Sequence, residues 1–330
     1  MDQSAMEKKS PANEFITLWV QDRIRLIAPI VTLVILVVFF SVVTERFDTW
    51  VNFINILQTS SVLLIAGCGI TMVLLIAEID LSFANLMTFL SIVLCALYVT
   101  AEAPAWLVIP VVFAVGLAMG ALNGVFIAYA GIPSFAVTLA TMTIFTGANE
   151  YITEGMPYYK VPDLLYYLGN GYLFGIPWLV YLAVVIAAVF AFVLKYTRFG
   201  RQVYMVGGNA ESARLSGVNV KRIRLLVFVI MGVTAAFAAL LGTGRLGSTQ
   251  SGEFESLLIG GIASVVIGGT SLFGGVGGIG HTVVGVLIWY VLRNGLDMMD
   301  ISIYLKTLLI GVILLLALLF NTLLQKQQSR

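Results

Sequence analysis

The chain has 330 residues, of which 60% are hydrophobic and only 11% are charged, and its mean hydropathy is +1.01. A soluble domain of average composition carries about 25% charged residues, so a soluble fold of this size could not bury so much apolar surface. The net charge of +1 gives no electrostatic reason to expect a nucleic-acid partner. The composition therefore predicts an integral membrane protein with many spans.

Hydrophobic segments recur along the chain after a polar N-terminal segment, residues 1–25, that contains no cleavable signal pattern. A helix needs about 20 apolar residues to cross about 30 Å of hydrocarbon. The predicted fold class is an all-α polytopic membrane protein with about ten transmembrane helices (eight to ten), some of them broken or re-entrant. The transmembrane domain covers residues 26–324, and a short tail follows at 325–330. The expected spans are 26–43, 57–77, 81–100, 106–129, 133–152, 176–194, 224–244, 256–272, 280–296 and 302–324.

Three stretches leave the details of this arrangement open. Residues 48–56 have the pattern of an amphipathic helix that lies in the membrane interface, with Trp50 at headgroup depth. The region 57–100 can be read as one broken pair of helices. The region 245–280 is rich in glycine, which favours re-entrant or half-length helices.

The distribution of Lys and Arg predicts the orientation. With the N-terminus in the cytoplasm, the cytoplasmic segments would hold 13 of the 18 basic residues, including seven between Lys195 and Arg224. The opposite orientation would translocate this densest basic loop. We therefore expect both termini on the cytoplasmic side. The longest external connection, 153–175, is rich in Tyr, Gly and Pro, and it is either an ordinary interfacial loop or a contact for an external partner.

The centre of the basic loop predicts a short helix with recognisable ends. A turn at Gly207 and Gly208 leads to Asn209, which is suited to the N-cap, and Glu211 falls in the first turn, where it favours the helix dipole. Gly217 stands at the C-cap position. The helix is either an amphipathic connector or a coupling helix for a motor subunit. Its candidate coupling residues are Gly207, Gly208, Asn209, Glu211, Ala213, Arg214, Leu215 and Gly217.

Several kinds of chemistry are missing from the sequence. It has no P-loop for nucleotide phosphates, no zinc-protease or nucleophile-elbow motif, and a single histidine, His281. Cys68 and Cys95 lie inside apolar runs, as buried small residues do. We therefore expect no metal, no cofactor and no enzymatic reaction in this chain. Few charges lie deep in the spans, so a transporter of this kind would take its energy from another subunit.

A few polar and glycine residues inside the apolar segments are candidates for a translocation pathway. Glu78 and Asp80 follow the second span, and the cost of a charge at the bilayer centre places them near an interface or a water-lined cavity. Each candidate also has a structural interpretation, as a helix cap, an interhelical hydrogen bond or a close packing face. The pathway candidates are Asp80, Ser82, Asn123, Gly268, Gly269, Thr270 and Ser271.

Four motifs resemble the permease subunits of ATP-binding-cassette sugar importers, the ribose/xylose/galactoside permease family, over about residues 50–322. Glu78 and Ala84 depart from the family pattern, which usually has glycines there, and Leu257-Leu258-Ile259-Gly260 replaces the usual aromatic-Glu-Leu-Asp run. The matching motifs are Gly207-Gly208-Asn209-x-Glu211-x-Ala213-x-Leu215-Ser216-Gly217-Val218-Asn219-Val220, Val265-Val266-Ile267-Gly268-Gly269-Thr270-Ser271-Leu272-Phe273-Gly274-Gly275-x-Gly277, Ile79-Asp80-Leu81-Ser82 and Asn294-Gly295-Leu296.

The resemblance implies the permease subunit of a binding-protein-dependent importer in the inner or plasma membrane of a bacterium, which moves a monosaccharide or related polyol by ATP-driven alternating access. It implies three protein partners: a cytoplasmic ABC ATPase that uses ATP and Mg²⁺, a second permease subunit that is a copy or a paralogue, and a periplasmic or extracellular sugar-binding protein. The alternative is an ion-coupled secondary carrier that works alone.

Overall fold

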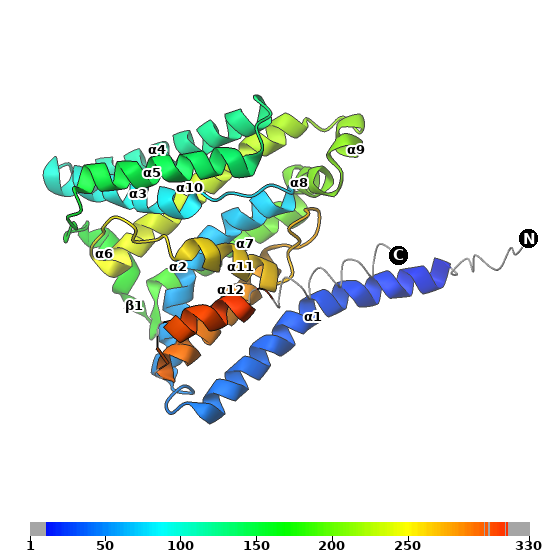
Figure 1. The fold of residues 1–330 in the computed structure, drawn as a ribbon, viewed down its shortest axis with the longest axis horizontal. Coiled ribbons are helices and arrows are strands. Elements are labelled where there is room, and N and C mark those ends of the chain that lie inside the picture. Colours follow the sequence, from blue (N-terminus) through cyan, green and yellow to red (C-terminus); the bar gives the residue numbers. More distant parts are fainter. Residues whose placement is uncertain (1–10, 300, 303, 314, 316–330) are drawn as a thin grey trace, which may run out of the picture.

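The computed structural model describes residues 11–299, 301–302, 304–313 and 315, and the side chains from residue 27 onward. The tail predicted at 325–330, with Lys326 and Arg330, lies outside the described residues. The chain is folded almost entirely into helices, which run in layers along a common direction (Figure 1). The predominantly helical character predicted from the sequence is confirmed, with one short β-hairpin at residues 172–177.

The elements follow one another with short connections. A π-helical turn, Ala96–Thr100, continues α3, and a further apolar helix occupies Tyr304–Ile313. The α-helices and strands are α1 Pro11–Val43, α2 Trp50–Leu75, α3 Phe83–Cys95, α4 Ala105–Ala128, α5 Ser134–Thr153, α6 Asp163–Asn170, β1 Tyr172–Leu173, β2 Ile176–Pro177, α7 Trp178–Tyr196, α8 Arg198–Gly208, α9 Ala210–Leu215, α10 Val220–Leu246, α11 Leu257–Ile267 and α12 Ile279–Met298.

Six helices among the described residues are long and apolar enough to cross a membrane: α2, α3 with its π-helical turn, α4, α7, α10 and α12. Three shorter apolar helices, Ile27–Val43, Leu257–Ile267 and Tyr304–Ile313, fall on further predicted spans. The chain is thus a polytopic helical membrane protein. The count of ten spans and the orientation stay predictions.

One predicted element is wrong as a separate unit. Residues 48–56 do not form an independent interfacial helix, because α2 begins at Trp50 and runs without a break to Leu75. Thr49 caps it, since the Asn52 amide donates to Thr49 Oγ1 at 3.3 Å. The region 57–100 is likewise two helices, α2 and α3, separated by the loop 76–82. In contrast, α11 has only 11 residues, as expected for the glycine-rich half-length helix.

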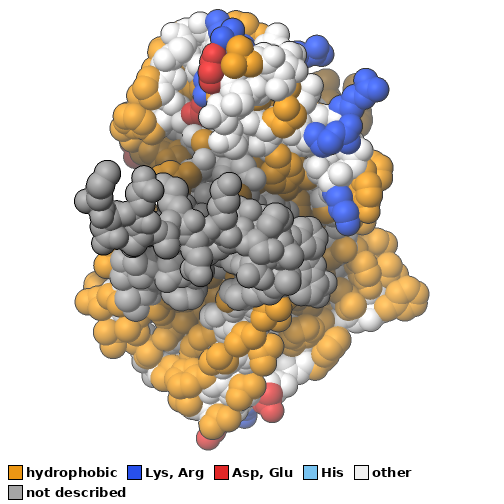
Figure 2. Space-filling model, turned by 90° about the vertical axis from the view of Figure 1, so that its right-hand side faces the viewer, with side chains coloured by type: hydrophobic (Ala, Val, Ile, Leu, Met, Phe, Trp, Pro, Cys, Tyr) orange, Lys and Arg blue, Asp and Glu red, His pale blue; other side chains and the backbone are white. Residues whose placement is uncertain are grey.

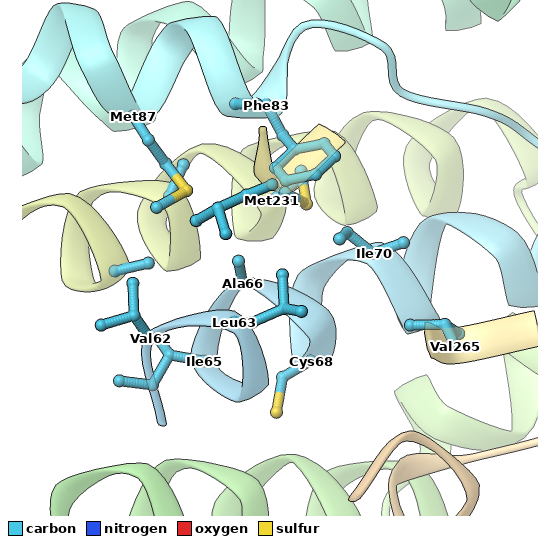
Figure 3. Close-up of a cluster of buried hydrophobic side chains, with 14 of the residues drawn as sticks. Val62, Leu63, Ile65, Ala66, Cys68, Ile70, Phe83, Met87, Met231 and Val265 are labelled. Carbon is cyan, nitrogen blue, oxygen red and sulfur yellow. The ribbon is translucent and has the colours of Figure 1, made fainter. Parts of the chain in front are cut away.

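Helix α2 lies at the centre of the bundle and is buried along most of its length. Figure 3 shows Leu63, Ala66 and Ile70 of α2 beneath Phe83 of α3 and Met231 of α10, all of them buried. Glycines let α4 and α10 cross closely: a Cβ at Gly120 would lie 2.4 Å from the Phe228 carbonyl oxygen. Close approach of small residues is how helices gain packing energy in lipid, where the hydrophobic effect does not drive them together.

The two ends of the bundle carry different structures (Figure 1). At one end, called the α9 end, α9 follows α8, and α8 contacts the end of α2 and the loop 268–278. At the opposite end, called the α6 end, α6 packs on the last turn of α10, and β1 pairs with β2 in an antiparallel hairpin. The candidate functional residues divide between these two ends.

Candidate functional site

The short helix predicted in the basic loop exists as α9, and its N-terminus is capped as expected. The Ser212 amide donates to Asn209 Oδ1 at 2.8 Å, so the N-cap prediction is confirmed. The predicted turn at Gly207-Gly208-Asn209 is wrong. Gly207 and Gly208 form the last turn of α8, and only Asn209, with φ −161° and ψ 107°, leaves the helical conformation. One extended residue is enough to redirect the chain between two helices.

The C-terminus of α9 is closed by two backbone hydrogen bonds. The Val218 amide donates to the Ala213 carbonyl and the Gly217 amide donates to the Arg214 carbonyl, each at 3.0 Å. Gly217 has φ +82°, in the left-handed region that glycine adopts without strain. This pair of bonds is a Schellman motif, which satisfies carbonyls that a helix end leaves free. The C-cap prediction at Gly217 is confirmed.

Helix α9 presents one face to its surroundings and buries the other. Ala213 is buried at 1% exposure, whereas Leu215 is 74% exposed although it is apolar. Arg214 donates two hydrogen bonds to Glu211, at 2.6 and 2.9 Å, and this bonding lowers the pKa of the Glu211 carboxyl. We call the exposed residues Glu211, Ser212, Arg214, Leu215 and Ser216 the α9 surface. An apolar tip beside an ion pair is a surface suited to docking.

Exposed basic side chains lie at the same end of the molecule as the α9 surface. Figure 2 looks onto this end of the molecule, and Lys and Arg side chains stand out from it. Arg224 is the exception among the loop's basic residues, because it is half-buried and its Nε lies 2.9 Å from Glu78 Oε1. Glu78, at which the chain departs from the family pattern, thus pairs with the end of the basic loop. The exposed basic residues of the loop are Lys195, Arg198, Arg201, Arg214, Lys221 and Arg222.

The end of α8 packs in close backbone contact with the end of α2 and with the glycine-rich loop. A Cβ at Gly207 would lie 1.7 Å from the Leu75 carbonyl oxygen, at the end of α2. The same carbonyl accepts a hydrogen bond of 3.0 Å from the Gly275 amide. We call this three-way contact of Gly207, Leu75 and Gly275 the glycine junction. It joins two motifs that lie far apart in the sequence.

The glycine-rich pathway candidates form a compact loop beside this junction. A Cβ at Gly268 would lie 1.9 Å from the His281 carbonyl oxygen, and the loop folds back so that the Gly278 amide donates to Thr270 Oγ1 at 3.4 Å. Gly269 has φ +113°, and Ser271 Oγ accepts from the Phe273 amide at 3.1 Å. Tyr204 of α8 donates its hydroxyl to the Gly277 carbonyl at 2.8 Å. These contacts fasten the loop to α8 and α12.

The other three pathway candidates form a single buried network. Asn123 Nδ2 donates to Ser82 Oγ at 3.1 Å, and the Ser82 hydroxyl and amide both donate to Asp80 Oδ1 at 2.7 Å. Ser82 stands at the N-cap of α3 but makes no capping bond with its side chain. Residues far apart in the sequence are thus brought together where the loop 76–82 meets α4. These hydrogen bonds agree with the structural interpretation of the three residues, in which their polar groups bond to one another and hold the loop against α4.

Sequence reasoning missed a cluster of polar residues at the α6 end. They line a cavity of about 330 Å³ between α2, α10, α12 and the loop 247–256. The signal in the sequence was Arg245 and Arg293, two charges at the margins of apolar segments. Ionisable residues within a membrane protein's apolar segments often mark functional sites. The residues beside these two arginines come from four separate segments, so the sequence alone does not show that they line one cavity.

Comparison with known proteins agrees with the resemblance found in the motifs. Residues 52–318 match a family model described as "Branched-chain amino acid transport system / permease component". The chain is 38% identical over 293 residues to a ribose import permease protein of Haemophilus influenzae, covering 88% of this chain and 90% of that protein. It is 34% identical over 311 residues to the ribose import permease protein of Escherichia coli K12, covering 93% and 95%.

A relative named for another sugar matches at a similar level. The D-allose transport system permease protein of Escherichia coli K12 is 33% identical over 294 residues, which cover 89% of this chain and 90% of that protein. The match to the family model spans well over half of the chain. The chain therefore belongs to this family of transport-system permease components, and it is a membrane transport subunit rather than an enzyme.

Proposed function

We propose that the chain is the membrane-spanning subunit of a binding-protein-dependent ABC importer that carries a monosaccharide or a related polyol. The observation that carries the proposal is α9, a doubly capped helix that places Leu215 on an exposed surface beyond the long apolar helices. The curated relatives named above are permeases for ribose and D-allose. Because they match almost the full chain, they favour a sugar over the branched-chain amino acids in the family description.

The proposed mechanism is alternating access driven by a partner ATPase, which binds and hydrolyses ATP with Mg²⁺. The ATPase would hold the α9 surface in a groove and move it. Helix α8 directly precedes α9, with only Asn209 between them, and the glycine junction connects α8 to the central helix α2 and to the loop before α12. A displacement of α9 would thus reach the core of the bundle. The chain itself would need no cofactor and no metal.

This mechanism assigns a side of the membrane to each end. The α9 end, with the exposed basic residues of the loop, faces the cytoplasm of a bacterium. The α6 end faces outward, where a sugar-binding protein would meet exposed aromatic side chains such as Phe174, at 93% exposure. A second permease subunit, a copy or a paralogue, completes the transporter in the inner or plasma membrane.

The test removes the exposed apolar tip of α9. Leu215→Asp leaves the core untouched because the side chain is already exposed. We expect the permease to insert normally and to lose both co-purification of the ATPase and sugar uptake. Phe174→Asp is the matched control: it makes the same change on an exposed side chain at the α6 end, and it should keep the ATPase bound. Normal ATPase co-purification by Leu215→Asp would contradict the proposal.

The second variant, Glu211→Lys with Gly217→Pro, destroys both the ion pair and the C-cap of α9. Proline cannot adopt φ +82°, so α9 should unravel while the protein still inserts. We expect this variant, like Leu215→Asp, to lose ATPase binding and sugar uptake.

The alternative is a secondary carrier that works alone. Such a carrier would transport sugar in liposomes without any ATPase, and its transport would depend on an ion gradient and not on ATP.

A further inference from the structure

The cavity at the α6 end has the size and lining of a small-molecule site. Its volume of about 330 Å³ falls at the lower end of the range of about 300–1,000 Å³ typical of ligand pockets. Buried apolar side chains of α2 and of the segment 254–257, among them Ile56 and Phe254, form part of its wall. The polar residues that carry the argument are Asn55, Thr59, Arg245, Glu253, Arg293 and Asp297.

The two guanidinium groups in the cavity retain donors for a ligand. A guanidinium offers five N–H donors. Arg245 uses one of them on Thr59 Oγ1, at 2.9 Å. Among the residues that the structure describes, the Arg293 side chain makes no hydrogen bond and no ion pair. Both side chains are half-buried. A hydrogen bond from either guanidinium to a ligand would therefore be stronger than the same bond at a fully exposed surface, because the local dielectric is lower.

The charged residues that line the cavity are two of each sign, the guanidiniums of Arg245 and Arg293 and the carboxylates of Glu253 and Asp297. Lys306, which pairs with Asp297, is not part of the lining. A balanced lining does not select an anion or a cation, whereas guanidinium and carboxylate groups can each bind two neighbouring hydroxyls in bidentate fashion. Asn55 and Thr59 add neutral donors and acceptors on the α2 side. Polar groups thus line several sides of the cavity. A ligand with hydroxyls around its ring needs hydrogen-bond partners in this arrangement.

We propose that this cavity binds a neutral polyhydroxylated ligand of monosaccharide size, as a stage of translocation inside one permease subunit. The inference rests on the proposed function, which supplies the sugar as cargo. It assigns direct contact with the sugar to Arg245, Arg293 and Asn55. It also separates the sugar site from the pathway candidates at the α9 end, which lie at the other end of α2.

The test is protection of one introduced cysteine by sugar. Ser256→Cys puts a thiol on the cavity wall, where Ser256 is exposed and makes no capping bond. The native Cys68 and Cys95 are both buried, so they contribute little labelling. The full-length protein in membranes is treated with a maleimide alone and with D-ribose, D-xylose, D-allose, D-galacturonate or L-leucine. Ser212→Cys, on the exposed α9 surface, is the matched control.

We expect at least one neutral sugar to slow labelling at position 256 about threefold at a concentration of about twice its dissociation constant, and to leave position 212 unchanged. Adding Arg293→Gln to Ser256→Cys should raise the protecting concentration about tenfold or more, because a charge-assisted hydrogen bond is lost. Three results would each overturn the proposal: no protection by any neutral sugar, equal protection at both positions, or stronger protection by L-leucine or D-galacturonate.

The readouts separate this inference from the proposed function. Loss of sugar protection with ATPase binding still dependent on Leu215 would reject the cavity and leave the importer intact. Sugar protection together with ATPase-independent transport would keep the cavity and reject the coupling role of α9.

Discussion

Glu78 Oε1 lies 2.9 Å from Arg224 Nε, and this ion pair joins the loop after α2 to the N-terminal part of α10. The Glu78 side chain is only 12% exposed, so its carboxylate depends on Arg224 for the interactions that water no longer provides. The pair also fastens the end of the basic loop to the central helix. Motion transmitted through the basic loop would therefore act on α2 at two places, this ion pair and the glycine junction.

The first prediction concerns this ion pair. Glu78→Ala should lower the free energy of unfolding by about 1–3 kcal/mol, because it leaves a half-buried guanidinium without its partner. A double-mutant cycle with Arg224→Ala should show a coupling energy of about 0.5–3 kcal/mol. Thermal unfolding of the four proteins in detergent measures it. Strictly additive losses would show that the two side chains do not stabilise one another.

The second prediction compares adjacent glycines at the end of α8. Gly207→Ala would place a Cβ 1.7 Å from the Leu75 carbonyl oxygen, so backbone must move and transport should fall. We expect a loss of about 1–3 kcal/mol or more in stability, as for overpacking in a core. Gly208→Ala is the control, since nothing lies within 4 Å of its added Cβ. It should be neutral or stabilise by about 0.5–1 kcal/mol, because alanine favours a helix.

Uptake and melting temperature of both variants distinguish the two positions. If Gly208→Ala were the more damaging change, the packing at the glycine junction would not explain why glycine stands at position 207.

The third prediction addresses the N-cap of α9. Asn209→Ala removes the acceptor of the Ser212 amide and should cost the helix about 0.5–2 kcal/mol, whereas Asn209→Asp should retain most of it. Hydrogen exchange of the amides in residues 210–216 measures this local stability. Faster exchange there, with no change in α2 or α10, is the expected pattern for Asn209→Ala. Unchanged exchange in Asn209→Ala would mean that the cap does not hold the helix.

The fourth prediction separates packing from sugar contact in the network around Ser82. Ser82→Ala deprives Asp80 of a hydroxyl donor and Asn123 of its acceptor, which should cost about 1–3 kcal/mol of stability. If the network only positions the loop 76–82, the KM for sugar uptake should stay unchanged while the melting temperature falls. Thr143→Ala, at an exposed position of α5, is the control. A raised KM without a change in stability would instead identify a sugar contact.

Local features of the site were predictable because they depend on neighbouring residues. The capping of α9 by Asn209 and Gly217 is decided within ten residues of chain, and both positions are as predicted. The extent of the preceding helix was not predictable in the same way. Gly207 and Gly208 favour a turn when considered alone, but the packing of α8 against Leu75 keeps them helical.

The membrane character, the mostly helical class and the capped helix of α9 are determined by the sequence alone, because composition, hydropathy and capping act over short stretches. The glycine junction, the network of Asp80, Ser82 and Asn123, and the polar cavity at the α6 end are decided only by tertiary structure. Their members come from segments tens to hundreds of residues apart. No periodicity within one helix can show which groups on distant segments will meet, because that depends on how α2, α4, α10 and α12 pack around one another.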